Sequence, residues 1–215
     1  MLRRLLLVRH GEVHNPDHIC YGDLPGFGLS PQGRLQAQAA AGYLVGLGAD
    51  LLVSSPIERA RETAGIIGRE LGLSPVADDR LHEWRLGARW AGVAWEALQE
   101  AFPGELGAYF SHPQNLAFSP ESLAEVALRI AGLITDLGDH HPGKTAILVS
   151  HQDPIQAARL ALTGAGFDGF HTDKPRHCAV FTLSGGPDWH LEAAWAPTGP
   201  RTDFPPAPAT DPAAV

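Results

Sequence analysis

The hydrophobic positions of this chain form short apolar runs that are separated by longer amphipathic stretches. The runs at 5–8, 51–55 and 144–150 are apolar at nearly every position until their carboxyl ends. This pattern is typical of strands that are buried on both faces of a parallel sheet. Residues 123–137 instead place apolar side chains three and four positions apart, which predicts an amphipathic helix that Ser119-Pro120 would cap.

The remaining pattern completes an α/β fold. Helices are predicted over 31–47, where Ser30 is the expected N-cap, and then from Pro56 to Leu71 and from Pro154 to about Leu162. Because strands alternate with helices, we expect a single three-layer α/β/α domain around a mostly parallel central sheet. Its expected extent is residues 1–196.

Other segments carry weaker signals. Residues 178–183 and 189–196 predict two further strands joined by a turn. Residues 12–29 are rich in Gly, Pro, Asp and His and predict a long loop, a kind of segment that is often functional. The region 80–118 predicts little beyond a short helix near 93–101. Its tryptophans, Trp84, Trp90 and Trp95, fit either the wall of a substrate pocket or the packing of a lid.

Residues 197–215 are mostly Pro, Ala, Thr and Asp, with almost nothing to bury. Such a composition cannot offset the entropy lost on ordering a chain, so we expect a disordered tail.

Basic and imidazole side chains follow the predicted strands. Arg9 and His10 end the first apolar run, Arg59 lies one turn after the second, and His151 ends the third. Ligands bind outside the carboxyl ends of strands in open α/β sheets, so we expect these residues to converge. We expect Gly11 to let the backbone turn sharply beneath them.

The residue types at this edge suit phosphoryl chemistry. Arginine offers a planar fork of donors that matches phosphate oxygens, and a neutral imidazole is a nucleophile near neutral pH. Two guanidinium charges would repel a cation, so we expect no metal and no cofactor. The pattern predicts a phosphate pocket that contains a histidine.

Composition narrows the functional class. The formal net charge of -8 argues against a nucleic-acid partner, which would require a basic face. Cys20 and Cys178 are far apart in the sequence and form no disulfide framework, so a reducing compartment is the simplest setting. No segment approaches the roughly 20 apolar residues of a spanning helix, so we expect no membrane partner. We therefore expect a soluble, cytoplasmic protein.

Arg9-His10-Gly11-Glu12 resembles the signature of the histidine phosphatase superfamily, the phosphoglycerate mutase-like enzymes. The resemblance extends from Leu5 to about Trp195. Its other motifs follow in order: Leu29-Ser30-Pro31-Gln32-Gly33, Ser54-Ser55-Pro56 with Arg59-Ala60 and Thr63-Ala64, Leu81-His82-Glu83 with Gly87, Glu121-Ser122-Leu123, and Val149-Ser150-His151.

The resemblance implies a role for each matched residue. His10 is the nucleophile that becomes a phosphohistidine. Arg9, Arg59 and His151 hold the phosphoryl oxygens, and His151 also stabilises the transferring group. Glu83 is the general acid that protonates the leaving oxygen and then activates water.

An acid assignment to Glu12 or Asp17 remains open. The chain also departs from the family pattern at three places. Val13 stands where many relatives have Thr, and the phosphate-binding Asn of relatives is displaced here to Asn15, which Pro16 follows. Gln152-Asp153 follows His151 where Gly-Gly is frequent, and a carboxylate from Asp153 at the pocket mouth would disfavour very anionic substrates.

These observations predict a metal-independent phosphatase that acts through a phosphohistidine on a small-molecule phosphomonoester. A phosphoglycerate mutase is the alternative enzyme. Only four basic residues lie between Glu83 and His151 to hold a second anion, which favours the phosphatase: Arg85, Arg89, Arg129 and Lys144. A catalytically weak, phosphate-binding interaction domain is the alternative outside enzymes, although a pure binder needs no acid. The sequence leaves the particular ester and the oligomeric state open.

Overall fold

The computed structural model describes residues 1–186 and 188–199. A six-stranded sheet lies at its centre, in the order β3-β2-β4-β1-β5-β6. The strands are β1 (Arg4–Arg9), β2 (Leu51–Ser54), β3 (Val76–Ala77), β4 (Thr145–Ser150), β5 (Val180–Ser184) and β6 (His190–Trp195).

Longer helices cover the sheet and shorter ones lie beyond it. The longer helices are α1 (Pro31–Val45), α2 (Glu58–Leu71), α6 (Leu123–His140) and α7 (Gln152–Leu162). The shorter ones are α3 (Leu86–Arg89), α4 (Leu98–Ala101) and α5 (Glu105–Ser111), with the 3-10 turns η1 (Asp79–Leu81) and η2 (Trp95–Ala97).

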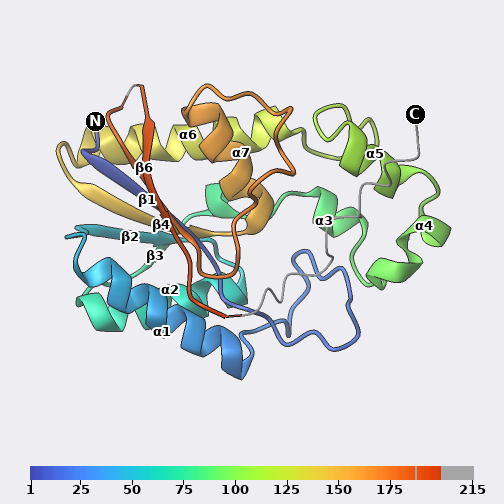
Figure 1. Cartoon of the computed structure of the whole chain (residues 1–215), viewed down its shortest axis with the longest axis horizontal. Helices are drawn as coiled ribbons and strands as arrows, with labels where there is room; N and C mark the ends of the chain where they lie inside the picture. The colour runs from blue at the N-terminus through green and yellow to red at the C-terminus, as the bar shows by residue number, and fades with distance from the viewer. Residues whose placement is uncertain (187, 200–215) are drawn as a thin grey trace.

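The sheet is mostly parallel, as predicted. β1 pairs in parallel with β4, and β2 pairs in parallel with both β4 and β3. β5 runs antiparallel to β1, and β6 runs antiparallel to β5. The α/β/α class is confirmed, because α1 and α2 cover one face of the sheet and α6 and α7 cover the other (Figure 1).

The apolar run of β1 explains these layers. Leu5 and Leu7 pack in the core on the α6 and α7 side, whereas Leu6 and Val8 pack in the core on the α1 and α2 side. All four are at most 1% exposed. Side chains alternate across a strand, so a run without polar residues requires a cover on both faces.

The amphipathic helix α6 is present, but its predicted cap is wrong. Ser122, not Ser119, is the N-cap: its Oγ accepts a hydrogen bond from Glu125 N, and Glu125 Oε2 accepts one from Ser122 N. The Ser119 hydroxyl instead donates to the Glu121 carbonyl at 2.6 Å. The reciprocal pair satisfies two backbone donors at the helix start, which Ser119-Pro120 cannot do.

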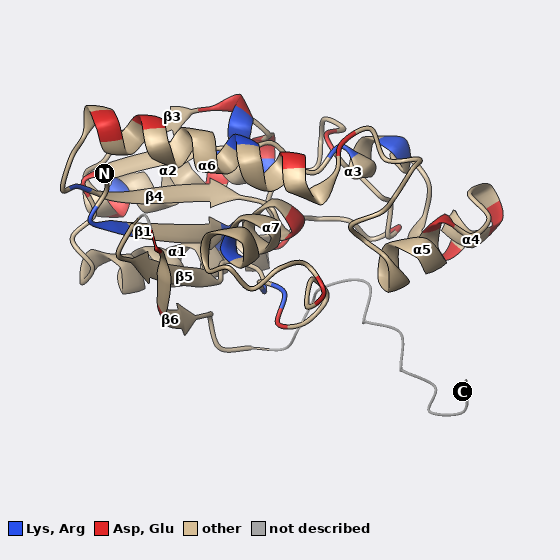
Figure 2. Ribbon diagram, turned by 90° about the horizontal axis from the view of Figure 1, so that it is seen from above, with Lys and Arg blue, Asp and Glu red and all other residues tan. Residues whose placement is uncertain are grey.

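The short helices form a separate layer of structure past the strand ends. Figure 2 shows α3, α4 and α5 beyond the carboxyl ends of β1 and β4. The region 80–118 is therefore a cap over that edge of the sheet, and the helix expected near 93–101 appears there as η2 and α4.

The structure does not test the predicted disordered tail or the predicted domain boundary. The predicted tail falls mainly on 200–215, which lies outside the described residues, and the domain extent of 1–196 stays a prediction. No helix in the described part of the chain is long and apolar enough to cross a membrane.

Candidate active site

The strand ends bring the predicted basic and imidazole side chains together. His10 follows β1, His151 follows β4, and Arg59 lies in the first turn of α2. The rings of His10 and His151 have centroids 5.2 Å apart, and Arg59 Nε donates to His10 Nε2 at 3.2 Å. His10, Arg59 and His151 are at most 1% exposed. The predicted convergence is confirmed.

The hydrogen bonds of His10 define its tautomer. Its Nδ1 lies 2.7 Å from the Gly11 carbonyl oxygen, which can only accept a hydrogen bond. Nδ1 therefore carries the proton, and Nε2 keeps a lone pair. Burial, followed by the charges of Arg59 and Arg9, lowers the pKa of His10 well below its ordinary value. A neutral imidazole whose lone pair lies on Nε2 is a nucleophile at that atom once Arg59 Nε, which donates to it, bonds to a phosphoryl oxygen instead.

Gly11 has a different role from the one expected. It is absent from the glycines with positive φ, so no left-handed turn requires it. A Cβ atom at Gly11 would instead lie 2.5 Å from the Gly33 carbonyl oxygen, and one at Gly33 would collide with the Glu12 carbonyl oxygen. Both glycines allow the start of α1 to contact the segment that carries His10.

The two arginines are held by backbone carbonyls. Arg59 Nη2 donates to the Gly22 carbonyl at 2.7 Å, and its guanidinium lies 4.6 Å from the centre of the Tyr21 ring. Arg9 Nη1 donates to the Pro175 carbonyl at 2.9 Å. Among the described residues, the buried Arg59 Nη1 meets no hydrogen-bond acceptor. A buried donor without an acceptor is costly, so this atom is suited to an anionic ligand.

Ser55 orients His151. The His151 Nε2 lies 2.8 Å from Ser55 Oγ, and that oxygen also accepts a hydrogen bond from Ile57 N at 3.3 Å. The Ser55 hydroxyl proton is thus available to His151 Nε2, which leaves Nδ1 as a donor. His151 Nδ1 lies 3.8 Å from Glu83 Oε2. Burial and the Arg59 charge lower the pKa of His151 well below its ordinary value.

Glu83 lies beside the basic side chains. Its Oε2 is 4.0 Å from Arg59 Nη2, and its Oε1 accepts a hydrogen bond from Trp84 N at 2.8 Å. Burial, with a smaller contribution from the negative charge of Asp153, raises the pKa of Glu83 to about 7. A carboxyl with such a pKa can both give and take a proton near neutral pH.

The alternative acids are placed less suitably. The carboxylate of Glu12 accepts a hydrogen bond from Ser30 Oγ at 2.7 Å, which ties it to the start of α1. Asp17 is exposed and is absent from the lining of the cavity that contains His10 and Glu83.

Asn15 lines the cavity, but its printed hydrogen bonds are to its own loop. Its Nδ2 donates to the Ile19 carbonyl at 3.0 Å, and its Oδ1 accepts from Ile19 N at 3.0 Å. The two bonds close the loop on itself. Phosphate binding by Asn15 therefore stays a prediction.

A cavity of about 910 Å³ opens from these residues towards the cap. Trp84, Trp90 and Trp95 all line it. Trp84 and Trp90 are also only 2% and 4% exposed and belong to the core. These two tryptophans therefore both line the pocket and pack the cap against the core. No group of three or more His, Cys, Asp or Glu side chains within 1–186 and 188–199 could hold a metal ion.

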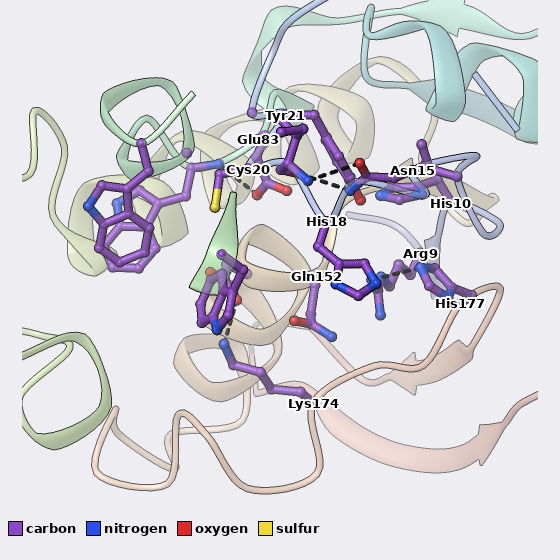
Figure 3. Close-up of a pocket in the computed structure, with 18 of the residues that line it drawn as sticks. Arg9, His10, Asn15, His18, Cys20, Tyr21, Glu83, Gln152, Lys174 and His177 are labelled. Atoms are coloured by element: carbon purple, nitrogen blue, oxygen red, sulfur yellow. Dashed lines mark hydrogen bonds and ion pairs between the residues drawn. The ribbon is translucent and has the colours of Figure 1, made fainter. Parts of the chain in front are cut away.

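Sequence reasoning missed a second polar group in this cavity. Lys174 Nζ donates to Asp153 Oδ1 and to Tyr109 Oη, each at 2.6 Å (Figure 3). Asp153 was expected to disfavour very anionic substrates, but the Lys174 ammonium beside it offsets its charge. His177 was also missed, and its Nε2 lies 2.9 Å from Arg9 Nη2. Lys174 and His177 lie between α7 and β5, where no periodic pattern could have placed them.

The similarity of this chain to known proteins identifies its family. It matches the model of the histidine phosphatase superfamily (branch 1) over residues 5–193. It is 32% identical over 168 residues to phosphoserine phosphatase 1 of Hydrogenobacter thermophilus, which covers 78% of this chain and 79% of that protein. It is 33% identical over 177 residues to glucosyl-3-phosphoglycerate phosphatase of Mycolicibacterium vanbaalenii, which covers 79% and 78%.

Solved structures agree with these matches. A mycobacterial glucosyl-3-phosphoglycerate phosphatase in complex with VO3 superposes with a TM-score of 0.80 at 30% identity, and the match covers 91% of this chain and 100% of that chain. The resemblance carried by the sequence motifs is thus confirmed. The chain belongs to branch 1 of the histidine phosphatase superfamily and is an enzyme of the phosphatase type.

Proposed function

We propose that this protein hydrolyses a small-molecule phosphomonoester through a phosphohistidine on His10. The observation that carries the proposal is the 2.7 Å contact between His10 Nδ1 and the Gly11 carbonyl oxygen. It leaves the lone pair on Nε2, the atom that Arg59 contacts, and Glu83 Oε2 lies within 4.0 Å of both Arg59 and His151.

In the first step, His10 Nε2 attacks phosphorus and the bond from phosphorus to the leaving oxygen breaks. Glu83 supplies the proton that the leaving oxygen takes up. Arg9, Arg59 and His151 bind the phosphoryl oxygens throughout, and their donors stabilise the charge of the transition state. We call Arg9, His10, Arg59 and His151 the phosphate end of the cavity.

In the second step, water attacks the phosphohistidine and the bond from His10 Nε2 to phosphorus breaks. Glu83, which lost its proton in the first step, takes one from the attacking water. Inorganic phosphate leaves, and both side chains return to their starting protonation. These steps need positioning and charge stabilisation but no metal ion.

A mutase would return the phosphoryl group from His10 to its substrate. The scarcity of cations around the cavity for a second phosphate group favours hydrolysis instead. Three of the four basic residues between Glu83 and His151 form ion pairs: Arg89 with Glu105, Arg129 with Glu121, and Lys144 with Asp50. Arg85 is exposed and is absent from the cavity lining. Besides Arg9, the cavity lining contains Lys174, which pairs with Asp153, so a second phosphate group would find few cations there. The names of the relatives, phosphoserine phosphatase and glucosyl-3-phosphoglycerate phosphatase, also favour hydrolysis of a small phosphorylated compound.

The proposal is tested by phosphate release from a panel of phosphomonoesters in the presence of EDTA, for wild type and His10→Ala. We expect turnover by wild type, no measurable turnover by the variant, and inhibition of wild type by vanadate. Equal activity of both proteins would exclude His10 as the nucleophile. Tight phosphate binding without turnover by wild type would instead support the interaction domain.

A further inference from the structure

The leaving alcohol must lie on the Glu83 side of the cavity, because the general acid contacts the leaving oxygen. Asp153 lines the same cavity as Glu83, and it is near enough for its charge to contribute to the raised pKa of Glu83. Asp153, Lys174 and Tyr109 line the same cavity as His10. Figure 3 shows Lys174 apart from the group of Arg9, His10 and His177. We call Asp153, Lys174, Tyr109 and the aromatic side chains Trp90, Trp95 and Phe110 the leaving-group side.

The polar members of the leaving-group side form a closed group of hydrogen bonds. Lys174 Nζ donates to Asp153 Oδ1 and Tyr109 Oη, and Tyr109 Oη donates to Asp153 Oδ2 at 3.2 Å. The ammonium also lies 4.4 Å from the centre of the Phe170 ring. Packing and hydrogen bonds therefore hold the ammonium in one place, as a site for orienting a ligand requires.

Hydrogen-bonding capacity remains in this group for a ligand. An ammonium has three N–H donors, and Lys174 Nζ meets two acceptors among the described residues. Each carboxylate oxygen of Asp153 accepts one of these hydrogen bonds and has a further lone pair. A ligand group that accepts from Lys174 and donates to Asp153 satisfies both.

The charge of the group selects a neutral ligand. The Lys174 ammonium and the Asp153 carboxylate lie 2.6 Å apart, so their charges cancel. An anion that approaches Lys174 meets the carboxylate, and a cation that approaches Asp153 meets the ammonium. A hydroxyl both donates and accepts without charge. The nearby α4 and α5 contain Glu100 and Glu105 but no Lys or Arg (Figure 2). Arg85 and Arg89 of the cap are absent from the cavity lining, so they add no cation there for a second anion.

The apolar members of the leaving-group side suit a ring. Trp90 and Trp95 meet edge to face with centroids 6.1 Å apart, and Trp95 and Phe110 do so at 6.3 Å. All three line the cavity, whose volume of about 910 Å³ greatly exceeds that of a phosphate group. Sites of this kind bind the apolar faces of a ligand on aromatic walls and orient it with a few polar groups.

We propose that Lys174, Asp153 and Tyr109 bind a hydroxyl group of the leaving alcohol, and that the substrate is the phosphate monoester of a neutral, polyhydroxylated ring. This inference rests on the hydrolysis proposed above. It names the class of alcohol, and it assigns Lys174 and Asp153 as residues that determine specificity.

The test measures binding in the His10→Ala background, where turnover does not interfere. Calorimetric titration gives the Kd of glucose 6-phosphate and of cyclohexylmethyl phosphate, which has a ring of the same size and a primary phosphate ester but no hydroxyl. We expect glucose 6-phosphate to bind about 10- to 100-fold more tightly than cyclohexylmethyl phosphate, because its hydroxyl gains a charge-assisted hydrogen bond. Adding Lys174→Met should reduce the ratio of the two Kd values by about 10- to 100-fold.

Two further variants serve as controls. Lys144→Met removes a lysine that pairs with Asp50 at the start of β4, away from the cavity lining, and should leave the Kd ratio unchanged. Asp153→Asn keeps the side-chain shape and should also reduce the Kd ratio. It therefore tests the same site even if Lys174→Met fails to fold. Because both ligands are titrated into the same protein sample, a partly inactive preparation does not alter the ratio.

Three results would overturn the inference: equal Kd values for the two esters, a ratio that Lys174→Met leaves unchanged, or tighter binding of 3-phosphoglycerate than of glucose 6-phosphate that depends on Lys174. The last result would assign the site to a carboxylate. Failure of the proposed hydrolysis appears separately, as a lack of His10-dependent turnover by wild type.

Discussion

The phosphate end and the leaving-group side of the cavity are built from different kinds of structure. His10 and His151 directly follow β1 and β4, and Arg59 lies in the first turn after β2. Asp153 lies in the first turn of α7, but Lys174, Tyr109 and the tryptophans come from the cap and from the segment between α7 and β5. The core therefore positions the residues for chemistry, while irregular segments position those that contact the alcohol. Binding residues on loops over a rigid scaffold can vary without disturbing the sheet.

The hydrogen bonds of the two regions differ in the same way. Arg59 and His10 are joined directly to each other, and both also bond to backbone carbonyls. Lys174, Asp153 and Tyr109 bond mainly among themselves. Substitutions at the phosphate end should thus affect every ester, whereas those on the leaving-group side should depend on the alcohol.

Glu83 lies between the two regions, and its replacement should give the largest of these effects. For Glu83→Gln we expect kcat/KM for an alkyl phosphate to fall about 10²- to 10⁴-fold, because the alkoxide loses its proton donor. p-Nitrophenyl phosphate should lose much less, since nitrophenolate leaves without a proton. Steady-state kinetics with both esters check this, and equal losses would contradict the role of acid.

Arg59→Lys tests whether a change at the phosphate end affects every ester alike. Lysine keeps the charge but loses the fork that reaches His10, Gly22 and the buried Nη1 position. We expect kcat/KM to fall about 10²- to 10³-fold for every ester, whatever its alcohol. Arg61→Lys, on the exposed side of α2, is the matched control and should retain activity. A loss that varied with the alcohol would contradict the division of the cavity.

The pH profile tests how the regions are coupled. The first step requires protonated Glu83, so kcat/KM for an alkyl ester should fall as pH rises through the pKa of about 7. Asp153→Asn removes a charge that raises this pKa, so the fall should move to lower pH. The lowered pKa values of His10 and His151 keep both rings neutral over this range. An unchanged profile in the variant would show that Asp153 does not act on Glu83.

Asn15→Ala should give the smallest effect. Its two hydrogen bonds with Ile19 order the loop that lines the cavity, so their loss should raise KM roughly 3- to 10-fold and leave kcat nearly unchanged. Steady-state kinetics with one alkyl ester suffice. A fall in kcat as large as that of Arg59→Lys would instead assign Asn15 to the phosphate end, as the family pattern implies.

The sequence predicted the phosphate end because its residues depend on strand ends. An apolar run that stops at Arg9-His10 or at His151 indicates both a buried strand and the edge where it ends. The same reasoning could not reach Lys174, since its partner Asp153 is 21 positions away and nothing periodic connects the two. Asp153 was consequently expected to disfavour very anionic substrates, and its pairing with Lys174 was not foreseen.

The residues that cap α6 and the role of Gly11 were predicted incorrectly. Ser122 with Glu125 three positions later is the capping-box pattern, and this pair, not Ser119-Pro120, begins α6. Gly11 was assigned to a turn, although a close approach to Gly33 explains it. That contact joins segments distant in sequence, so only the folded structure could show it.

The most direct test of the account is to trap the phosphoenzyme. Wild type is mixed with p-nitrophenyl phosphate, quenched in alkali, in which a phosphohistidine is stable, and analysed by peptide mass spectrometry. We predict one added phosphoryl group on the peptide that contains His10, with more of it in Glu83→Gln, where water is no longer activated. Turnover of the ester without any phosphoryl group on His10 would contradict the account.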